Sequence, residues 1–406
     1  LPNLKAGSIS CDKPFTLKVN ATVAHLRLQL AEHECAIVTI KADGMHMSPS
    51  SGSDKTRLPL AGKRMAFIGD SITDGHTMPI LFEQSLKASG IMPPICTNVA
   101  VAGNRASDML ARLDRDVIPF HADFVALSAG VNDANNGITP EQYGKDITDI
   151  VDMLSADGSQ VIILTPTPIT SPKAAEVKPR WAEYTIFLRN LAAQRKLRLV
   201  ECDRRMEEAI ADGQSVMGGD GVHIDFPGYR VMTRALLDAL GYSNVPVVEK
   251  MQLTIMPGVI SLWKTRRAPT DIPLAESDVS SINPDADWKK LSLPEESSAA
   301  EPGGWWLEQE RQRGFVVGLD LVAGKAKRYQ CVAEVASSKE RQAYLNTGGT
   351  LETIWLNGKK VYQTPGNSGW HPGKERIQVT FKSGTNQILV ETASRFFLSI
   401  TDDNKW

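Results

Sequence analysis

The sequence predicts an α/β protein built on a doubly wound parallel sheet, followed by an accessory all-β sandwich domain. Three observations support this prediction. Between residues 63 and 242, apolar runs typical of buried strands alternate with amphipathic helical stretches. After about residue 314, short β-rich runs separated by Asn-Gly and Ser-Gly turns replace that alternation. The chain has 406 residues, which is enough for two or more domains.

Composition excludes several functional classes. The 45 Lys and Arg residues nearly balance the 47 Asp and Glu residues, so the formal net charge is −2. This balance gives no electrostatic basis for binding nucleic acid or an anionic membrane, and no apolar run approaches the ~18 residues of a membrane span. The chain begins at Leu1. A removed signal peptide or a cloning boundary would both leave such a start, and we expect a secreted or periplasmic protein.

Cysteine and histidine spacing predicts no metal site and no cofactor. The five cysteines show no Cys-x-x-Cys spacing, and the seven histidines occur singly. Cys11 and Cys35 flank a predicted hairpin. Either they form a disulfide in an oxidising compartment, or they are separate buried thiols.

The first 60 residues form an N-terminal β segment in this prediction. Strands are expected at 15–19, 26–30 and 36–40, where apolar residues alternate or β-branched residues cluster. Three strands make a poor independent core, so the segment is expected to lie against another sheet. A Ser-rich stretch at 48–53 then leads into the main domain.

Residues 61–245 form the predicted α/β domain. We expect strands at 64–68, 97–101, 124–128, 161–165 and 197–201, and helices at 78–88, 106–113, 140–154, 179–194 and 227–240. Crossovers of this length imply a parallel sheet that helices cover on both faces.

Residues 246–304 are predicted to be a linker, and 305–406 a β-sandwich module. The linker contains short extended pieces at 257–263 and 288–293 within stretches rich in Ser, Asp, Glu and Pro. Seven of the eight tryptophans follow residue 260. Their rings either stack on sugars or, as we favour, fill the sandwich core and the domain contacts.

A Gly-Asp-Ser sequence at 69–71 follows the first strand of the α/β domain. Ser71 therefore lies at the carboxyl edge of a parallel sheet, where open α/β sheets bind ligands. The backbone N–H groups of a helix start lie beside its hydroxyl. Ser71 is either a nucleophile or simply the residue that begins the helix.

Three further stretches favour the nucleophile. The sequences Asn-Val-Ala-Val-Ala-Gly-Asn at 98–104, Ser-Ala-Gly-Val-Asn-Asp at 128–133 and Asp-Gly-Val-His at 220–223 follow in order. Together with residues 69–71 they resemble the four sequence blocks of the SGNH (GDSL-type) hydrolases, over about residues 63–242. The resemblance implies a three-layer, flavodoxin-like fold.

The same blocks supply a complete set of catalytic candidates. Ser71 would be the nucleophile, His223 its base and Asp220 the carboxylate that orients the base. Asp225 lies two residues after His223 and could compete for the ring, but the family pattern favours Asp220. The oxyanion hole would use the backbone N–H groups of Ser71 and Gly103 and the side-chain amide of Asn132.

Acyl transfer to water suits these candidates, and the family's typically open site favours small acyl groups. The stretches 354–362 and 382–389 resemble the jelly-roll, galactose-binding-like modules of carbohydrate-active enzymes. We therefore expect a carboxylic ester hydrolase that removes acetyl groups from a plant polysaccharide such as xylan. The alternatives are a lipase, arylesterase or thioesterase, or a non-catalytic carbohydrate-binding protein.

Overall fold

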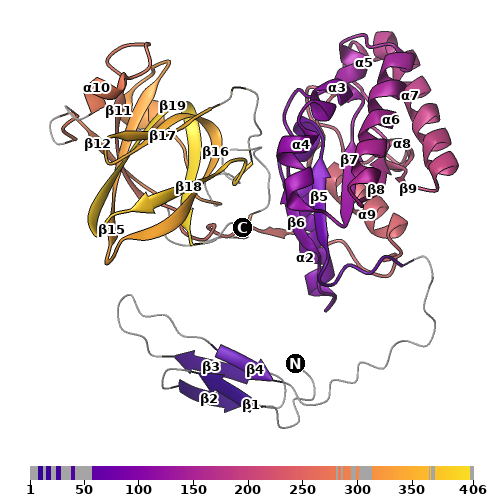
Figure 1. Ribbon diagram of the computed structural model, residues 1–406. Helices are drawn as coiled ribbons and strands as arrows, with labels where there is room; N and C mark the ends of the chain where they lie inside the picture. The colour runs from indigo at the N-terminus through magenta and orange to yellow at the C-terminus, as the bar shows by residue number, and fades with distance from the viewer. Residues whose placement is uncertain are drawn as a thin grey trace. The chain divides into compact units, whose positions relative to one another are not determined.

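The structure is a computed structural model that divides the chain into two compact units, Leu1–Lys55 and Thr56–Trp406 (Figure 1). It describes residues 57–279, 282–284, 287–293, 313–364, 366 and 371–402. For 8–11, 15–19, 24–28, 38–41 and 299–300 it describes the backbone alone.

The first unit contains four described strands, one more than predicted. β1 (Ser8–Cys11) pairs with β4 (Val38–Lys41), and β2 (Phe15–Val19) pairs with β3 (Ala24–Leu28), both antiparallel. Sequence analysis missed β1, because its four residues Ser-Ile-Ser-Cys include few of the β-branched and aromatic residues that mark strands. Cys35 lies outside the described residues, so the Cys11–Cys35 disulfide stays a prediction.

A five-stranded parallel sheet forms the centre of the α/β domain (Figure 1). Its order, β6-β5-β7-β8-β9, places the first strand of the domain between the second and the third. This is the flavodoxin-like doubly wound order that the sequence predicts. The strands are β5 (Arg64–Ile68), β6 (Ile95–Asn98), β7 (Phe124–Ser128), β8 (Gln160–Leu164) and β9 (Arg198–Val200).

Helices cover both faces of this sheet, each over its own apolar cluster. One face packs on α2 (Thr77–Ala88), α8 (Cys202–Ala211) and α9 (Phe226–Ala239). The other face packs on α3 (Ala106–Leu110), α4 (Leu113–Asp116), α6 (Pro140–Ala156) and α7 (Ala174–Arg195). The shorter helices are α1 (Ser71–Asp74), α5 (Val131–Asn135) and the 3₁₀ turn η1 (Ile118–Phe120). The three-layer prediction is confirmed.

Three helical regions differ from the predictions. The single helix expected at 106–113 is divided into α3 and α4. The helix expected to begin at Pro179 begins at Ala174 and contains Pro179. Burial of Val177 and Trp181 on either side of the proline holds the helix together there. Helix α8 was missed altogether, because charged residues dominate it and only four of its residues are buried.

The second part of this unit is an antiparallel β domain. Its eight-stranded sheet has the path β12-β11-β15-β19-β16-β17, with β14 paired to β19 and β18 to β16. The strands are β11 (Leu262–Arg267), β12 (Lys289–Ser292), β14 (Phe315–Val316), β15 (Tyr329–Ser337), β16 (Arg341–Leu356), β17 (Lys359–Gln363), β18 (Arg376–Phe381) and β19 (Gly384–Thr401). Strands β11 and β12 thus come from the stretch predicted as linker. That stretch also holds α10 (Glu276–Val279) and a short pair between β10 (Met251–Gln252) and β13 (Ala299–Ala300); α12 (Leu319–Ala323) follows β14.

The long strands β16 and β19 change partners along their length, so one continuous sheet covers the main apolar core of the domain. A smaller apolar cluster lies around Trp355. Trp263 and Trp355 are buried among the described residues of this domain. Trp288 is partly covered by the Arg266 guanidinium, 4.5 Å from its ring centre. These three rings thus serve packing, as favoured above, and the other four late tryptophans lie outside the described residues. None of the helices in the described part of the chain has the length and hydrophobicity that a membrane span needs.

Candidate active site

Ser71 begins α1 at the carboxyl end of β5. The carboxylate of Asp70 caps this helix, accepting a hydrogen bond from the Ile72 N–H at 3.0 Å. The Tyr229 hydroxyl on α9 donates to the Ile72 carbonyl at 2.9 Å. A side chain at position 69 would meet the Thr73 hydroxyl at 2.5 Å, so the turn before the serine requires glycine. Buried groups on both sides therefore fix the position of Ser71.

The structure brings His223 and Asp220 to this serine. Nε2 of His223 lies 2.8 Å from Ser71 Oγ, although the two residues are 152 positions apart. Nδ1 of the same ring lies 2.6 Å from Asp220 Oδ2. The side chains of His223 and Asp220 are 27% and 53% exposed, so the site is open to solvent. This chain of contacts has the geometry of a serine, its base and the carboxylate that orients the base.

Backbone groups hold the Asp220 carboxylate in place. Its Oδ1 accepts the N–H groups of Val222 and His223, both at 2.9 Å. Partial burial raises the pKa of Asp220, but hydrogen bonds from the His223 ring and these two N–H groups outweigh it and lower the pKa to about 2. Asp220 is therefore ionised at neutral pH and stabilises a positive charge on the imidazole.

A second loop, which sequence reasoning missed, clamps the His223 loop. The N–H groups of Thr170 and Ser171 both donate to the Gly221 carbonyl, at 2.7 and 3.1 Å. Gly221 has a φ of +67°, and a Cβ there would lie 2.4 Å from the Ser171 nitrogen. Only glycine satisfies both constraints. Only their position could have indicated this role, because residues 170–171 follow β8 at the same edge of the sheet.

Two of the three predicted oxyanion donors follow the strands on either side of β5, and the third, Ser71, follows β5 itself. Gly103 lies in the exposed loop after β6, with a φ of +81°, and Asn132 lies in α5 after β7. The Asn132 amide donates one hydrogen bond to the Asn104 carbonyl at 3.1 Å. This bond links the two loops and leaves the second N–H of that amide for another acceptor.

Arg112, another residue that the sequence analysis did not single out, supports the Gly103 loop from inside. Its Nε donates to the Asn104 side-chain oxygen at 2.8 Å, and its Nη1 donates to the Val99 carbonyl and to Asp116. The guanidinium is buried. A buried charge with two acceptors on this loop and a third on α4 fixes the loop strongly.

Two buried carboxyl groups lie behind the site. Burial raises the pKa of Asp70 to about 6, against the hydrogen bond from Ile72 and the nearby His223. Burial likewise raises the pKa of Asp133 to about 6, against the hydrogen bond from the Ala106 N–H. Both groups order backbone turns, and the carboxylate in contact with the His223 ring is Asp220, the favoured candidate.

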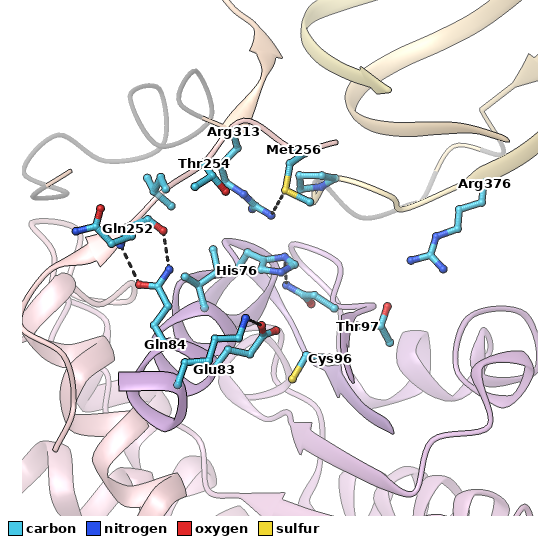
Figure 2. Close-up of a pocket in the computed structure, with 15 residues that line it drawn as sticks. His76, Glu83, Gln84, Cys96, Thr97, Gln252, Thr254, Met256, Arg313 and Arg376 are labelled. Carbon is cyan, nitrogen blue, oxygen red and sulfur yellow. Dashed lines mark hydrogen bonds and ion pairs between the residues drawn. The ribbon is translucent and has the colours of Figure 1, made fainter. Parts of the chain in front are cut away.

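A pocket of about 260 Å³ opens between α2, β6 and the β domain, and Figure 2 shows its walls. Gln84 and Gln252 pair there through two hydrogen bonds of 2.6 and 2.9 Å. Burial, with the charges of Arg313 and His371, keeps the pKa of His76 well below its usual value, so its ring is neutral. None of the predicted site residues lines this pocket. Across the described residues, no group of three or more His, Cys, Asp or Glu is placed to hold a metal ion.

Comparison with known proteins finds a family match over the part of the chain that carries this site. Residues 67–231 match the model of the GDSL-like lipase/acylhydrolase family. An acetylxylan esterase of Geobacillus stearothermophilus is 23% identical over 213 residues, which cover 46% of this chain and 97% of that protein.

Solved structures with a similar fold cover the same share of the chain. An alpha/beta hydrolase from the metagenome of Lake Arreo, Spain, is 22% identical with a TM-score of 0.41, covering 46% of this chain and 98% of its own. The Geobacillus stearothermophilus acetylxylan esterase is 20% identical with a TM-score of 0.41, and the match covers 45% of this chain and 95% of its own. A putative GDSL-like lipase from Parabacteroides merdae is 20% identical with a TM-score of 0.41, and the match covers 46% of this chain and 99% of its own.

Proposed function

Because residues 67–231 form a domain of the GDSL-like lipase/acylhydrolase family, which makes the chain a carboxylic ester hydrolase, we propose that Ser71, His223 and Asp220 are its catalytic residues. Their substrate in this proposal is a small acyl ester, in particular an acetyl group on a polysaccharide such as xylan. The observation that carries the proposal is the hydrogen-bonded path from Ser71 Oγ through the His223 ring to Asp220, at 2.8 and 2.6 Å.

The first half-reaction forms an acyl-enzyme. Ser71 Oγ attacks the ester carbonyl carbon while His223 Nε2 takes its proton, and the carbonyl oxygen becomes an oxyanion. The imidazolium then gives that proton to the leaving sugar oxygen as the ester C–O bond breaks. Asp220, with its pKa of about 2, keeps its negative charge beside Nδ1 throughout.

The second half-reaction releases the acid. His223 removes a proton from water, which attacks the acyl carbon, and the imidazolium returns the proton to Ser71 Oγ as acetate leaves. The N–H groups of Ser71 and Gly103 and the Asn132 amide are the proposed donors to the oxyanion in both halves. All three follow β5 or one of the two strands that pair with it, which supports this role.

Openness of the site supports a small acyl group on a large carrier. The base and its carboxylate are both partly exposed, so an ester on the surface of a polymer has access without a channel. The name of the relative, acetylxylan esterase, gives an acetylated polysaccharide as its substrate. These two observations favour acetyl esters over long acyl chains.

Hydrolysis of p-nitrophenyl esters tests the proposal. The wild-type chain should hydrolyse the acetyl ester much faster than the octanoyl ester, and Ser71→Ala should lose at least ~10³-fold in kcat. A faster octanoyl reaction would favour a lipase. Full activity of Ser71→Ala would exclude Ser71 as the nucleophile, and no activity of the wild type would favour a carbohydrate-binding protein.

Acetate release from a panel of acetylated polysaccharides tests the carrier. We expect release from acetylated xylan with wild-type protein and none with Ser71→Ala. Release from p-nitrophenyl acetate but from no polysaccharide would favour a small-molecule esterase and contradict the polysaccharide part of the proposal.

A further inference from the structure

Asp74 ends the short helix that Ser71 begins, and its buried carboxylate joins three segments of the chain. The side chain is 2% exposed. Its Oδ2 accepts the Ala102 N–H at 2.8 Å, and its Oδ1 accepts the His371 N–H at 3.2 Å. Ala102 directly precedes Gly103. One carboxylate therefore contacts the nucleophile helix, the loop that carries a proposed oxyanion donor, and the β domain.

The His371 ring contacts the same carboxylate oxygen. Its Nδ1 lies 3.3 Å from Asp74 Oδ1, and the His371 side chain is only 6% exposed. With a proton on Nδ1, the ring adds a second donor beside the backbone N–H. Removing a buried carboxylate from water is costly unless several donors compensate it, and His371 supplies two of the three contacts named here.

The β domain holds His371 rigidly for this contact. The Thr347 carbonyl on β16 accepts the N–H groups of Gly373 and Lys374, at 2.8 and 3.1 Å, and the Thr347 N–H donates to the Glu375 carbonyl at 3.0 Å. A Cβ at Gly348 would lie 3.0 Å from the His371 carbonyl oxygen, so this strand approaches the segment closely. Pro372 and Arg376 of the same segment line the pocket of Figure 2, as do Thr97 and Asn98 of β6.

We propose that His371 is a positioning residue for ester hydrolysis: it fixes Asp74, and Asp74 fixes the Ala102 peptide beside the oxyanion donor Gly103. The β domain is then part of the support of the active site and more than an appended binding module. This inference rests on the proposed function, because it assigns a purpose to the Gly103 N–H. Placement errors of about 1 Å in such groups cost up to ~10²-fold in rate.

Labelling of Ser71 by a fluorophosphonate tests the inference, because its phosphoryl oxygen uses the same donors as the substrate oxyanion. In this reaction Ser71 Oγ forms a bond to phosphorus, fluoride leaves, and His223 takes the serine proton. We expect His371→Ala to label every molecule, but with a rate constant about tenfold lower than wild type. His371→Asn, whose side-chain amide can take the place of Nδ1, should recover most of the rate.

Two further variants complete the test. Asp74→Asn keeps the shape but loses one acceptor, so it should slow labelling by a similar factor. Gln378→Ala, on an exposed position of β18, should label at the wild-type rate. A merely structural role would lower the fraction of labelled protein and leave the rate constant of that fraction unchanged.

The outcomes separate this inference from the proposed function. If His371→Ala and Asp74→Asn label at the wild-type rate, the positioning role is wrong, whatever the wild type hydrolyses. If His371→Ala yields no folded protein, the labelling rate constants of His371→Asn and Asp74→Asn test the positioning role instead. If Ser71 takes no label in the wild type, the result contradicts the proposed role of Ser71 as the nucleophile.

Discussion

The nucleophile turn at 69–74 and the base loop at 218–223 meet at one site, but the chain holds them in opposite ways. The turn is anchored by burial, since Asp70 and Asp74 are both 2% exposed. The base loop is only partly buried and is held by backbone hydrogen bonds, to the Asp220 carboxylate and from residues 170–171 to Gly221. Rigidity at this site thus comes from packing on one side and from a hydrogen-bonded loop on the other.

The acids of the two regions show the same contrast. Burial raises the pKa of Asp70 to about 6, whereas hydrogen bonds outweigh partial burial and lower the pKa of Asp220 to about 2. A buried acid that resists ionisation suits a structural cap, and an exposed acid that is ionised over the working pH range suits the partner of an imidazolium. The four predictions below test this division of roles.

The largest effect should come from the ionised acid of the base loop. Asp220→Asn removes the negative charge beside Nδ1 and lets the ring adopt the wrong tautomer, so kcat for p-nitrophenyl acetate should fall by about 10³–10⁴. Asp225→Asn is the matched control and should change kcat by less than about tenfold. The reverse ranking of the two variants would make Asp225 the partner of His223.

The next largest effect on kcat should come from Asn132, the proposed oxyanion donor that follows β7. Asn132→Ala removes a proposed oxyanion donor and its bond to the Asn104 carbonyl, so kcat should fall by about 10²–10³ with the fold intact. Asn136→Ala, at the exposed C-cap of α5, loses only a hydrogen bond to the Asn132 carbonyl and should retain nearly full activity. Circular dichroism should be the same for both variants, and unchanged kcat in Asn132→Ala would remove this residue from the oxyanion hole.

The backbone of the base loop should show a smaller effect. Gly221→Ala forces a Cβ to 2.4 Å from the Ser171 nitrogen at a φ of +67°, so the loop must shift. We expect kcat to fall about 10–100-fold and stability to fall by about 1–3 kcal/mol. Gly219→Ala in the same loop has no neighbour within 4 Å, and both its kcat and its thermal unfolding should match wild type.

The buried acid of the nucleophile turn should affect stability and its pH dependence. The pKa of Asp70 in the folded protein, about 6, lies above its ordinary value of 3.8, so the folded state binds this proton more tightly. The resulting stability is present below about pH 4 and is lost as the pH rises through 6. Asp70→Asn keeps an oxygen for the cap but cannot ionise, and it should be more stable than wild type at pH 8 by about 1–3 kcal/mol.

Thermal unfolding from pH 4 to pH 8 measures this difference. The melting temperature of Asp70→Asn should fall less over this range than that of wild type, although Asp133 still contributes to the decrease. Asp114→Asn, at an exposed position, should follow the wild-type curve. Identical curves for Asp70→Asn and wild type would mean that Asp70 is not a buried acid of raised pKa.

Sequence reasoning worked best where local patterns carry the information. Strands β5 and β7 begin and end where predicted, because each is a continuous apolar run bounded by polar residues or glycine. Sequence reasoning failed at α8, because half of its residues are charged and only a narrow face of the helix is buried. It also failed at Pro179, because buried residues on both sides of the proline stabilise the helix through it. For the site, motif order identified Ser71, Asp220 and His223 as candidates, while the clamp at 170–171 carries no comparable motif.

From its sequence alone, this protein is an α/β chain with a Gly-Asp-Ser turn, an Asp-x-x-His loop and a β-rich C-terminal part, because periodicity and motif spacing are local properties. Only the tertiary structure decided that the ring of His223 lies 2.8 Å from Ser71 and that His371 contacts Asp74 from 297 residues away. Such contacts depend on how sheets and loops pack. Motif order named His223 as a candidate but gave no distance to Ser71, and no local pattern indicated the contact of His371.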